Sequence, residues 1–174
     1  MRQPGNLSEI KAIVCDVDGV LTDGRIGYRD DGNEIKFFHV RDGHGIVLAL
    51  RAGLKVGILS GRRSLANRTR AEELKLSFLY EGCRNKAEGF RTLLAEQGLK
   101  PEECMYIGDD VVDIPPMRMA GFSVAVGDGA AELDAVCHCR TKCRGGLGAV
   151  REAIEILLKG QGKWDELMKR YLSC

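Results

Sequence analysis

The sequence has no apolar run long enough to cross a membrane and almost no net charge. Its 26 basic and 25 acidic residues leave a formal net charge of +1, so no basic field favours a nucleic-acid partner. A membrane-spanning helix needs about 20 mostly apolar residues, so we expect no membrane partner. Segment 1–8 is polar and lacks the apolar stretch of a signal peptide, which predicts a cytoplasmic protein.

The sequence also lacks the cysteine pattern of a disulfide framework. Its seven cysteines are odd in number and scattered, which argues against a small secreted scaffold. The exception is a cluster of Cys137, His138, Cys139 and Cys143, whose side chains could ligate zinc. Because Cys137 and Cys139 are two residues apart, without the usual turn between ligands, we favour reduced thiols over a zinc site there.

What the sequence does contain is an alternation of strands and helices. The length of 174 residues, with 44% hydrophobic and 29% charged residues, predicts a single domain, residues 1–174. Short apolar runs predict buried strands at 10–15, 54–59, 77–80, 105–107, 122–126 and 135–139. Amphipathic stretches predict helices at 45–52, 65–74, 86–97 and 149–158. We therefore predict an α/β fold, a Rossmann-like parallel sheet with helices on both faces.

One segment breaks this alternation. Residues 24–40 show no helical period, and two extended stretches flank a turn signal at 30–33. We predict a β-hairpin over about residues 25–39. Because a two-stranded hairpin is marginal alone, its apolar side chains need another surface, which self-association would supply. These side chains are Ile26, Tyr28, Ile35 and Phe37. The tail, residues 163–174, is a short amphipathic helix or a mobile arm.

Polar side chains follow the predicted strands where a parallel sheet binds its ligands, at the carboxyl ends. They are Asp16, Asp18, Ser60, Lys86, Asp109 and Asp110. Carboxylates suit Mg²⁺, which neutralises phosphate charge and so lets a carboxylate attack phosphorus. Asp18 could act as acid and base, while Ser60 and Lys86 hold phosphate oxygens. Any one such Asp could be a helix cap, but four separate segments together favour a Mg²⁺-dependent phosphatase.

These residues resemble the signatures of the haloacid dehalogenase-like superfamily of phosphatases, in order and spacing over nearly the whole chain. The stretches are Asp16-Val17-Asp18-Gly19-Val20-Leu21-Thr22, Ser60-Gly61-Arg62, Lys86 and Gly108-Asp109-Asp110-Val111-Val112-Asp113. The resemblance implies that Asp16 is the nucleophile and a metal ligand, and that Asp109 is another ligand. Asp18 is implied as the acid/base residue, whose backbone carbonyl also binds the metal. Supporting roles fall to Thr22 and to Asp110 or Asp113.

Within the superfamily, the chain resembles the subfamily of 3-deoxy-D-manno-octulosonate 8-phosphate (KDO 8-phosphate) phosphatases. Only a hairpin replaces the cap domain, segment 38–43 follows it, and glycines lie at 145, 146 and 148. That resemblance implies a sugar-phosphate substrate in lipopolysaccharide sugar synthesis. It also implies a homotetramer with the hairpins at its centre and a neighbouring subunit closing each site. The implied substrate-binding residues are Asp18, His39, Val40, Arg41, Asp42, Gly43, Arg62, Arg70 and Lys86.

Several alternatives stay open at this point. The sugar could be a nine-carbon sialic-type 9-phosphate, or the chain could be a non-catalytic regulatory subunit, although both leading carboxylates are present. Arg70 could belong to a solvated basic helix face, and His39, taken to lie on a strand with Phe37, could be a packed histidine. The segment Cys83-Arg84 departs from the expected loop before Lys86, so the exact sugar is not fixed by the motifs.

Overall fold

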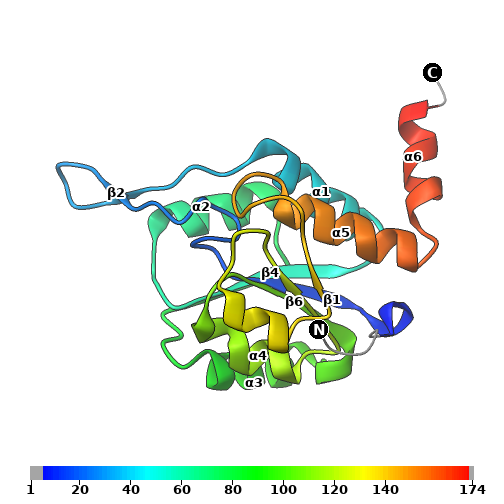
Figure 1. Cartoon of the computed structure of the whole chain (residues 1–174). Coiled ribbons are helices and arrows are strands. Elements are labelled where there is room, and N and C mark those ends of the chain that lie inside the picture. The colour runs from blue at the N-terminus through cyan, green and yellow to red at the C-terminus, as the bar shows by residue number, and fades with distance from the viewer. Residues whose placement is uncertain (1–5, 173–174) are drawn as a thin grey trace.

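The structure is a computed structural model and describes residues 6–172. Its centre is a six-stranded sheet in the order β5-β4-β1-β6-β7-β8, with all neighbouring strands parallel (Figure 1). The strands are β1 (Ala12–Cys15), β4 (Lys55–Ser60), β5 (Phe78–Glu81), β6 (Cys104–Gly108), β7 (Phe122–Ala125) and β8 (Cys139–Arg140). The prediction of a parallel α/β sheet is confirmed.

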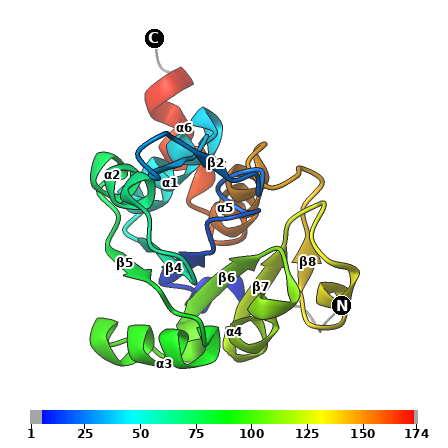
Figure 2. The same ribbon diagram turned by 90° about the vertical axis from the view of Figure 1, so that its left-hand side faces the viewer.

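Helices cover both faces of this sheet (Figure 2). One layer holds α1 (Val40–Arg51), α2 (Leu65–Leu74) and α5 (Ala149–Gly160); the other holds α3 (Lys86–Gln97) and α4 (Ile114–Met119). Strand β1 serves both layers because successive side chains point to opposite faces. Ile13 and Cys15 pack in the core cluster with α1 and α5, whereas Ala12 and Val14 pack in the cluster with α3.

Two sequence-based assignments near the ends of elements were wrong. Helix α1 begins at Val40 rather than at residue 45, so His39 precedes its first turn and lies on no strand. The apolar period could not show this turn, which contains Arg41, Asp42 and Gly43. The sixth strand is only Cys139–Arg140, because residues Ala131–Ala135 form a short 3₁₀ helix. Helix α4 was not predicted, since Pro115 and Pro116 in its first turn hide it.

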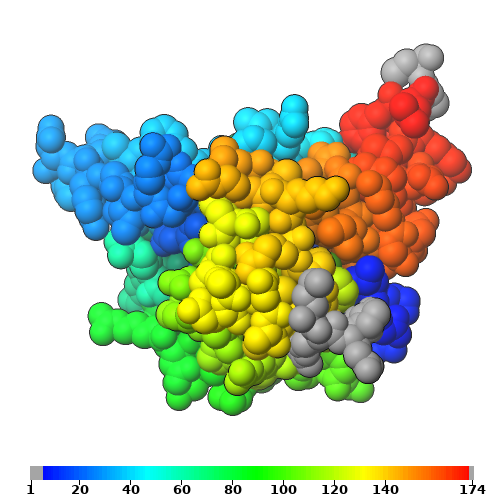
Figure 3. All heavy atoms as spheres, in the orientation of Figure 1, coloured from blue at the N-terminus to red at the C-terminus, as the bar shows by residue number. Residues whose placement is uncertain are grey.

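The predicted hairpin is present and projects from the body of the molecule (Figures 1 and 3). It consists of β2 (Gly27–Tyr28) paired antiparallel with β3 (Glu34–Ile35). The four apolar side chains expected to need another surface are all exposed, Phe37 most of all at 76%. The hairpin therefore presents an apolar surface that residues 6–172 leave uncovered.

The tail forms helix α6 (Trp164–Leu172), and residues 173–174 lie outside the described part of the chain. Trp164 anchors it, because the indole ring lies against the guanidinium of Arg151 and the ammonium group of Lys159, 5.4 and 5.0 Å from the ring centroid. Leu167 and Met168 also pack against the core. No helix within residues 6–172 combines the length and apolar character that a membrane span requires.

Candidate active site

The loop after β1 places Asp16 at the carboxyl edge of the sheet. Asp16 is buried, and its Oδ1 accepts a hydrogen bond from the backbone N–H of Val17 at 2.7 Å. Thr22 braces the loop, because its hydroxyl donates to the Val17 carbonyl at 3.3 Å. The same oxygen accepts from the N–H groups of Gly19 and Gly24, at 3.4 and 3.3 Å. The structure thus places Thr22 as a brace of the loop that carries Asp16.

Three carboxylates from two loops meet at this edge. Asp16, Asp109 and Asp113 each offer an oxygen, and these atoms lie within 4.8 Å of one another. Two glycines permit this approach. Gly19 has a left-handed φ of +84°, and a Cβ there would lie 2.0 Å from Asp109 Oδ2; a Cβ at Gly108 would lie 2.6 Å from Asp113 Cβ. The glycines of both motifs therefore bring the acidic side chains together.

A buried lysine connects this acidic cluster to helix α3. Lys86 is the first residue of α3, whose start is capped by Asn85 Oδ1, which accepts the Glu88 N–H at 3.3 Å. Lys86 Nζ lies 2.5 Å from Asp16 Oδ2 and 2.5 Å from Asp113 Oδ1. One ammonium group thus faces two of the three carboxylates.

Asp113 belongs to this cluster and Asp110 does not. Asp113 is fully buried; its Oδ1 accepts from the Tyr106 hydroxyl at 2.8 Å, and its Oδ2 accepts from the Asp109 N–H at 3.0 Å. Asp110 is exposed, and its side chain accepts from the Val111 N–H at 2.7 Å, where it caps a 3₁₀ turn. Of the two residues proposed for support, the geometry favours Asp113.

The charge balance of the cluster suits a divalent cation. Burial raises the pKa of Asp16 to about 6, opposed by Lys86 and assisted by Asp113. Burial, together with Asp113 and Asp16, raises the pKa of Asp109 to about 8. Burial disfavours the charged form of Lys86, but Asp16 and Asp113 outweigh it and raise the pKa of the lysine. Three crowded carboxylates with one ammonium group lack positive charge, and their oxygens are the donors that Mg²⁺ prefers.

Asp18 lies outside this cluster and contacts the hairpin instead. Its carboxylate pairs with Lys36 and lies 3.9 Å from Arg62 Nε. The Lys36 side chain is only 3% exposed and lies 3.5 Å from Glu34, which also accepts from Arg62 Nε at 3.1 Å. Sequence reasoning missed Lys36; the one available signal was a lysine between two apolar residues, Ile35 and Phe37.

Ser60 is the last residue of β4, beside β1 at the same edge of the sheet. It is buried, and its Oγ accepts the Arg62 backbone N–H at 3.2 Å. Its carbonyl accepts the Cys83 N–H at 3.0 Å, which ties the loop before Lys86 to β4. This bond fixes the two proposed phosphate-holding segments relative to each other.

Asp42, predicted to bind substrate, caps a helix. It is buried, and its carboxylate accepts from the backbone N–H groups of Gly148 and Arg151, at 3.1 and 2.7 Å. These groups begin α5, so Asp42 satisfies N–H donors that have no partner within the helix. The geometry therefore gives Asp42 a structural role between α1 and α5.

Of the other residues proposed around α1, Gly43 lies beside Arg70. Its guanidinium pairs with Glu73 at 2.8 Å and lies 5.5 Å from the centroid of the Phe38 ring. Gly43 allows this position, since a Cβ there would lie 2.2 Å from Arg70 Nη2.

Val40 and Arg41 are exposed, and His39 Nδ1 lies 3.9 Å from the carboxylate of Asp42. Arg70 also lines a groove of about 490 Å³ with Glu34 and Lys36, which connects this group to the hairpin.

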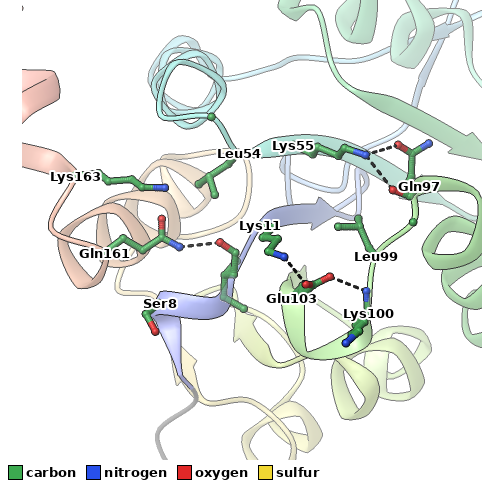
Figure 4. A pocket seen from close by; sticks show the side chains of 13 residues that line it. Ser8, Lys11, Leu54, Lys55, Gln97, Leu99, Lys100, Glu103, Gln161 and Lys163 are labelled. Atoms are coloured by element: carbon green, nitrogen blue, oxygen red, sulfur yellow. Dashed lines mark hydrogen bonds and ion pairs between the residues drawn. The ribbon is translucent and has the colours of Figure 1, made fainter.

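A pocket of about 600 Å³ at the opposite edge of the sheet has no such chemistry (Figure 4). Lys11 pairs there with Glu103 at 2.6 Å, and Lys55 donates to the Gln97 carbonyl at the end of α3, at 3.0 Å. Helix C-termini carry partial negative charge, which stabilises a lysine placed near them and explains its position without a ligand. The acidic cluster, rather than this hollow, is the candidate active site.

The cysteine cluster gathers no metal-binding group. Across residues 6–172, Asp16, Asp109 and Asp113 are the only three acidic, cysteine or histidine side chains placed closely enough to hold an ion. His138 Nδ1 instead lies 2.9 Å from both the backbone N and the hydroxyl of Ser123. The zinc alternative therefore finds no support in the described geometry.

Comparisons with known proteins agree with this site. The sequence-family model of the haloacid dehalogenase-like hydrolases matches residues 63–154 of this chain. The chain is 43% identical to the KDO 8-phosphate phosphatase KdsC of Escherichia coli strain K12, over 90% of this chain and 84% of the relative.

Solved structures extend the similarity. A KDO 8-phosphate phosphatase from Moraxella catarrhalis, in complex with magnesium, phosphate and KDO, superimposes with a TM-score of 0.92 at 37% identity, covering 95% of each chain. The corresponding enzyme from Yersinia pestis gives 0.88 at 40% identity, covering 92% of this chain and 86% of the other. The chain therefore belongs to the haloacid dehalogenase-like hydrolases, and within them to the family of KDO 8-phosphate phosphatases.

Proposed function

We propose that this chain hydrolyses KDO 8-phosphate to KDO and inorganic phosphate through an aspartyl-phosphate on Asp16. The observation that carries the proposal is the acidic cluster at one edge of the sheet, with Lys86 shared between Asp16 and Asp113. The substrate follows from the relatives: the names of similar chains specify KDO 8-phosphate, and one solved relative contains KDO, phosphate and magnesium.

Mg²⁺ is the metal that we assign to the site. Asp16 and Asp109 would hold it with the backbone carbonyl of Asp18, while Asp113 supports Asp109 through the N–H that it accepts. When bound, the ion neutralises charge on the phosphate group and so permits a carboxylate to approach phosphorus. The raised pKa values of Asp16 and Asp109 support this assignment, because a cation relieves the repulsion that contributes to them.

In the first step, a carboxylate oxygen of Asp16 attacks phosphorus and the bond from phosphorus to the sugar oxygen breaks. The electron pair of that bond goes to the leaving oxygen, which takes a proton from Asp18. Ser60 and Lys86 hold the other phosphate oxygens, whose charge must be stabilised in the transition state. Lys86 suits this role because it is already fixed beside the nucleophile.

In the second step, water attacks the phosphorus of the aspartyl-phosphate. Asp18 accepts a proton from this water, the phosphorus–oxygen bond to Asp16 breaks, and the Asp16 carboxylate is restored. Inorganic phosphate leaves and Asp18 again carries the proton that the next cycle uses. The contacts of Asp18 with Lys36 and Arg62 support its place near the leaving group, at the side of the cluster that faces the hairpin.

The proposal extends to the assembly and to the setting of the reaction. Residues 1–174 form one domain, and four copies associate through their hairpins. The exposed side chains Ile26, Tyr28, Ile35 and Phe37 support this association. The reaction belongs to the synthesis of the lipopolysaccharide sugar in the cytoplasm, as the relation to this family implies.

Phosphate release across a panel of sugar phosphates tests the substrate. With Mg²⁺ present, KDO 8-phosphate should give the highest kcat/KM, above a nine-carbon sialic-type 9-phosphate. A higher kcat/KM for the nine-carbon compound would identify that compound as the substrate, with the proposed mechanism unchanged. No phosphate release from any ester, including p-nitrophenyl phosphate, would favour a non-catalytic subunit.

A further inference from the structure

A third hollow, of about 590 Å³, lies beside the candidate active site. Two loops form it with one hairpin residue, and both loops follow strands at the carboxyl edge, after β4 and β5. Its lining residues are Glu34, Gly61, Arg62, Arg63, Gly82 and Arg84. We call this the arginine pocket. Neither Arg63 nor Arg84 was among the residues that the sequence motifs indicated.

The arginine pocket has an excess of positive charge. Three guanidinium groups line it with one carboxylate, that of Glu34, which Arg62 and Lys36 already pair. Within residues 6–172, the guanidinium groups of Arg63 and Arg84 make no ion pair with a carboxylate. Two unpaired guanidinium groups beside one hollow favour an anion in it, because a guanidinium binds a carboxylate through two parallel hydrogen bonds.

Arg63 and Arg84 are exposed, and the backbone of the two loops shapes the pocket between them. Gly82 has a left-handed φ of +74°, and a Cβ there would lie 2.7 Å from Arg63 Nε, so the Arg63 side chain lies across this glycine. The loop that carries Arg84 is tied to the end of β4, where the Cys83 N–H donates to the Ser60 carbonyl at 3.0 Å. The pocket is thus fixed relative to the proposed phosphate position.

The pocket lies on the side where the organic part of the substrate must leave. Asp18 donates a proton to the leaving oxygen in the proposed mechanism, so the sugar extends from phosphorus on the side of Asp18. Arg62 forms a wall of the arginine pocket, and its Nε lies 3.9 Å from Asp18 Oδ2. A sugar that leaves past Asp18 therefore meets the arginine pocket.

We propose that Arg63 and Arg84 bind a carboxylate on the organic part of the substrate and so select phosphate esters of sugar acids. This inference rests on the proposed function, because it takes the phosphate position and the role of Asp18 from it. Glu34 contributes by fixing Arg62 with a charge pair, which leaves the other two guanidinium groups to meet the ligand.

The test compares KDO 8-phosphate with its carboxyl methyl ester, which lacks the negative charge but keeps the phosphate. In the Mg²⁺-loaded enzyme, the ratio of their kcat/KM values should fall about tenfold in Arg84→Gln and in Arg63→Gln, the scale of one hydrogen bond to a charged group. Arg91→Gln, an exposed arginine on α3, is the matched control and should keep the wild-type ratio. Unchanged ratios in both pocket variants would overturn the inference.

A binding measurement makes the test independent of turnover. Asp16→Asn protein with Mg²⁺ should bind 6-phosphogluconate more tightly than glucose 6-phosphate, and Arg84→Gln in the same background should remove most of that difference. Equal affinity for the two compounds before the arginine is changed would refute the arginine pocket as a carboxylate site. Failure of the proposed function would be seen in a different result, because the unmodified enzyme would then release no phosphate from KDO 8-phosphate.

Discussion

The Nζ atom of Lys86 lies 2.5 Å from Oδ2 of Asp16. Both side chains are nearly inaccessible, at 5% and 9% exposure, so neither charge can turn to solvent for a partner. Removing one member of a buried pair leaves the other charge uncompensated, which costs roughly 3–5 kcal/mol. The pair therefore makes the proposed nucleophile dependent on the first residue of α3, and variants at Asp16 need a stability control.

Asp16→Asn should abolish phosphate release, with a loss of at least about 1000-fold in kcat, because an amide oxygen does not form the acyl-phosphate. The measurement is phosphate release from KDO 8-phosphate with Mg²⁺, with thermal unfolding to show that the variant is folded. Asp30→Asn, in the exposed turn of the hairpin, is the matched control and should retain activity. A rate near normal in Asp16→Asn would remove the nucleophile assignment.

Asp113→Asn should raise the Mg²⁺ concentration for half-maximal activity at least tenfold, whereas Asp110→Asn should change it less than about threefold. The carboxylate of Asp113 faces Lys86, Tyr106 and the Asp109 N–H, while that of Asp110 caps an exposed turn. Titration of activity with Mg²⁺ measures both. Equal effects of the two substitutions would contradict the assignment of Asp113 as the supporting residue.

The metal-free protein should lose stability as the pH rises, and Mg²⁺ should restore it. The pKa of Asp109 is about 8 in the folded state against an ordinary 3.8, so the folded state binds a proton there that the unfolded chain does not. The contribution of this proton to the stability of the folded state is fully present below pH 3.8 and is lost as the pH rises through about 8. Asp16 adds the same effect, which ends near its pKa of about 6.

Thermal unfolding in chelator, at about pH 5 and about pH 9, measures this dependence. Asp109→Asn, which cannot ionise, should show a smaller fall in Tm between the two pH values, by roughly 2–4 °C for each kcal/mol removed. Added Mg²⁺ should raise the Tm of the unmodified protein more at the higher pH. An equal pH dependence in Asp109→Asn would show that the Asp109 pKa is not raised.

The sequence predicted the strands that carry the acidic residues, and for a physical reason. Buried parallel strands read as apolar runs that end in polar residues, and β1, β4 and β6 all follow this pattern. The convergence of Asp16 and Asp109 then follows from strand order, since β1 and β6 are neighbours. Helices α2 and α3 were predicted with the bounds observed.

Contacts set by the tertiary fold were not available to sequence reasoning. Asp42 was predicted only as a substrate-binding residue, and its carboxylate also caps a helix more than 100 residues away in the chain. Lys36 looks like an exposed strand lysine, and only the fold of the hairpin over the active site buries it against Asp18. The first turn of α1 has no apolar period in the sequence, so the start of this helix depends on tertiary contacts.

Asp42→Asn should lower the free energy of unfolding by about 1–2 kcal/mol while changing KM for KDO 8-phosphate less than about threefold. The two carboxylate oxygens accept one N–H group each at the start of α5, whereas an asparagine side chain has only one acceptor oxygen. Arg41→Gln, the exposed neighbour, is the matched comparison and should leave stability unchanged. A large rise in KM without loss of stability in Asp42→Asn would instead support the predicted substrate-binding role of Asp42.

The hairpin should serve assembly and catalysis through different side chains. Phe37 and Ile26 are exposed and apolar, so replacing both by Ser should dissociate the oligomer, measured by light scattering.

Lys36 is buried against Asp18 and Glu34, so Lys36→Met should keep the oligomer and lower kcat, and Lys36→Arg should recover part of the rate. Deleting residues 25–37 should produce both defects at once. An oligomer unchanged by that deletion would refute assembly through the hairpin, and a normal kcat in Lys36→Met would show that the pair with Asp18 only fixes the hairpin.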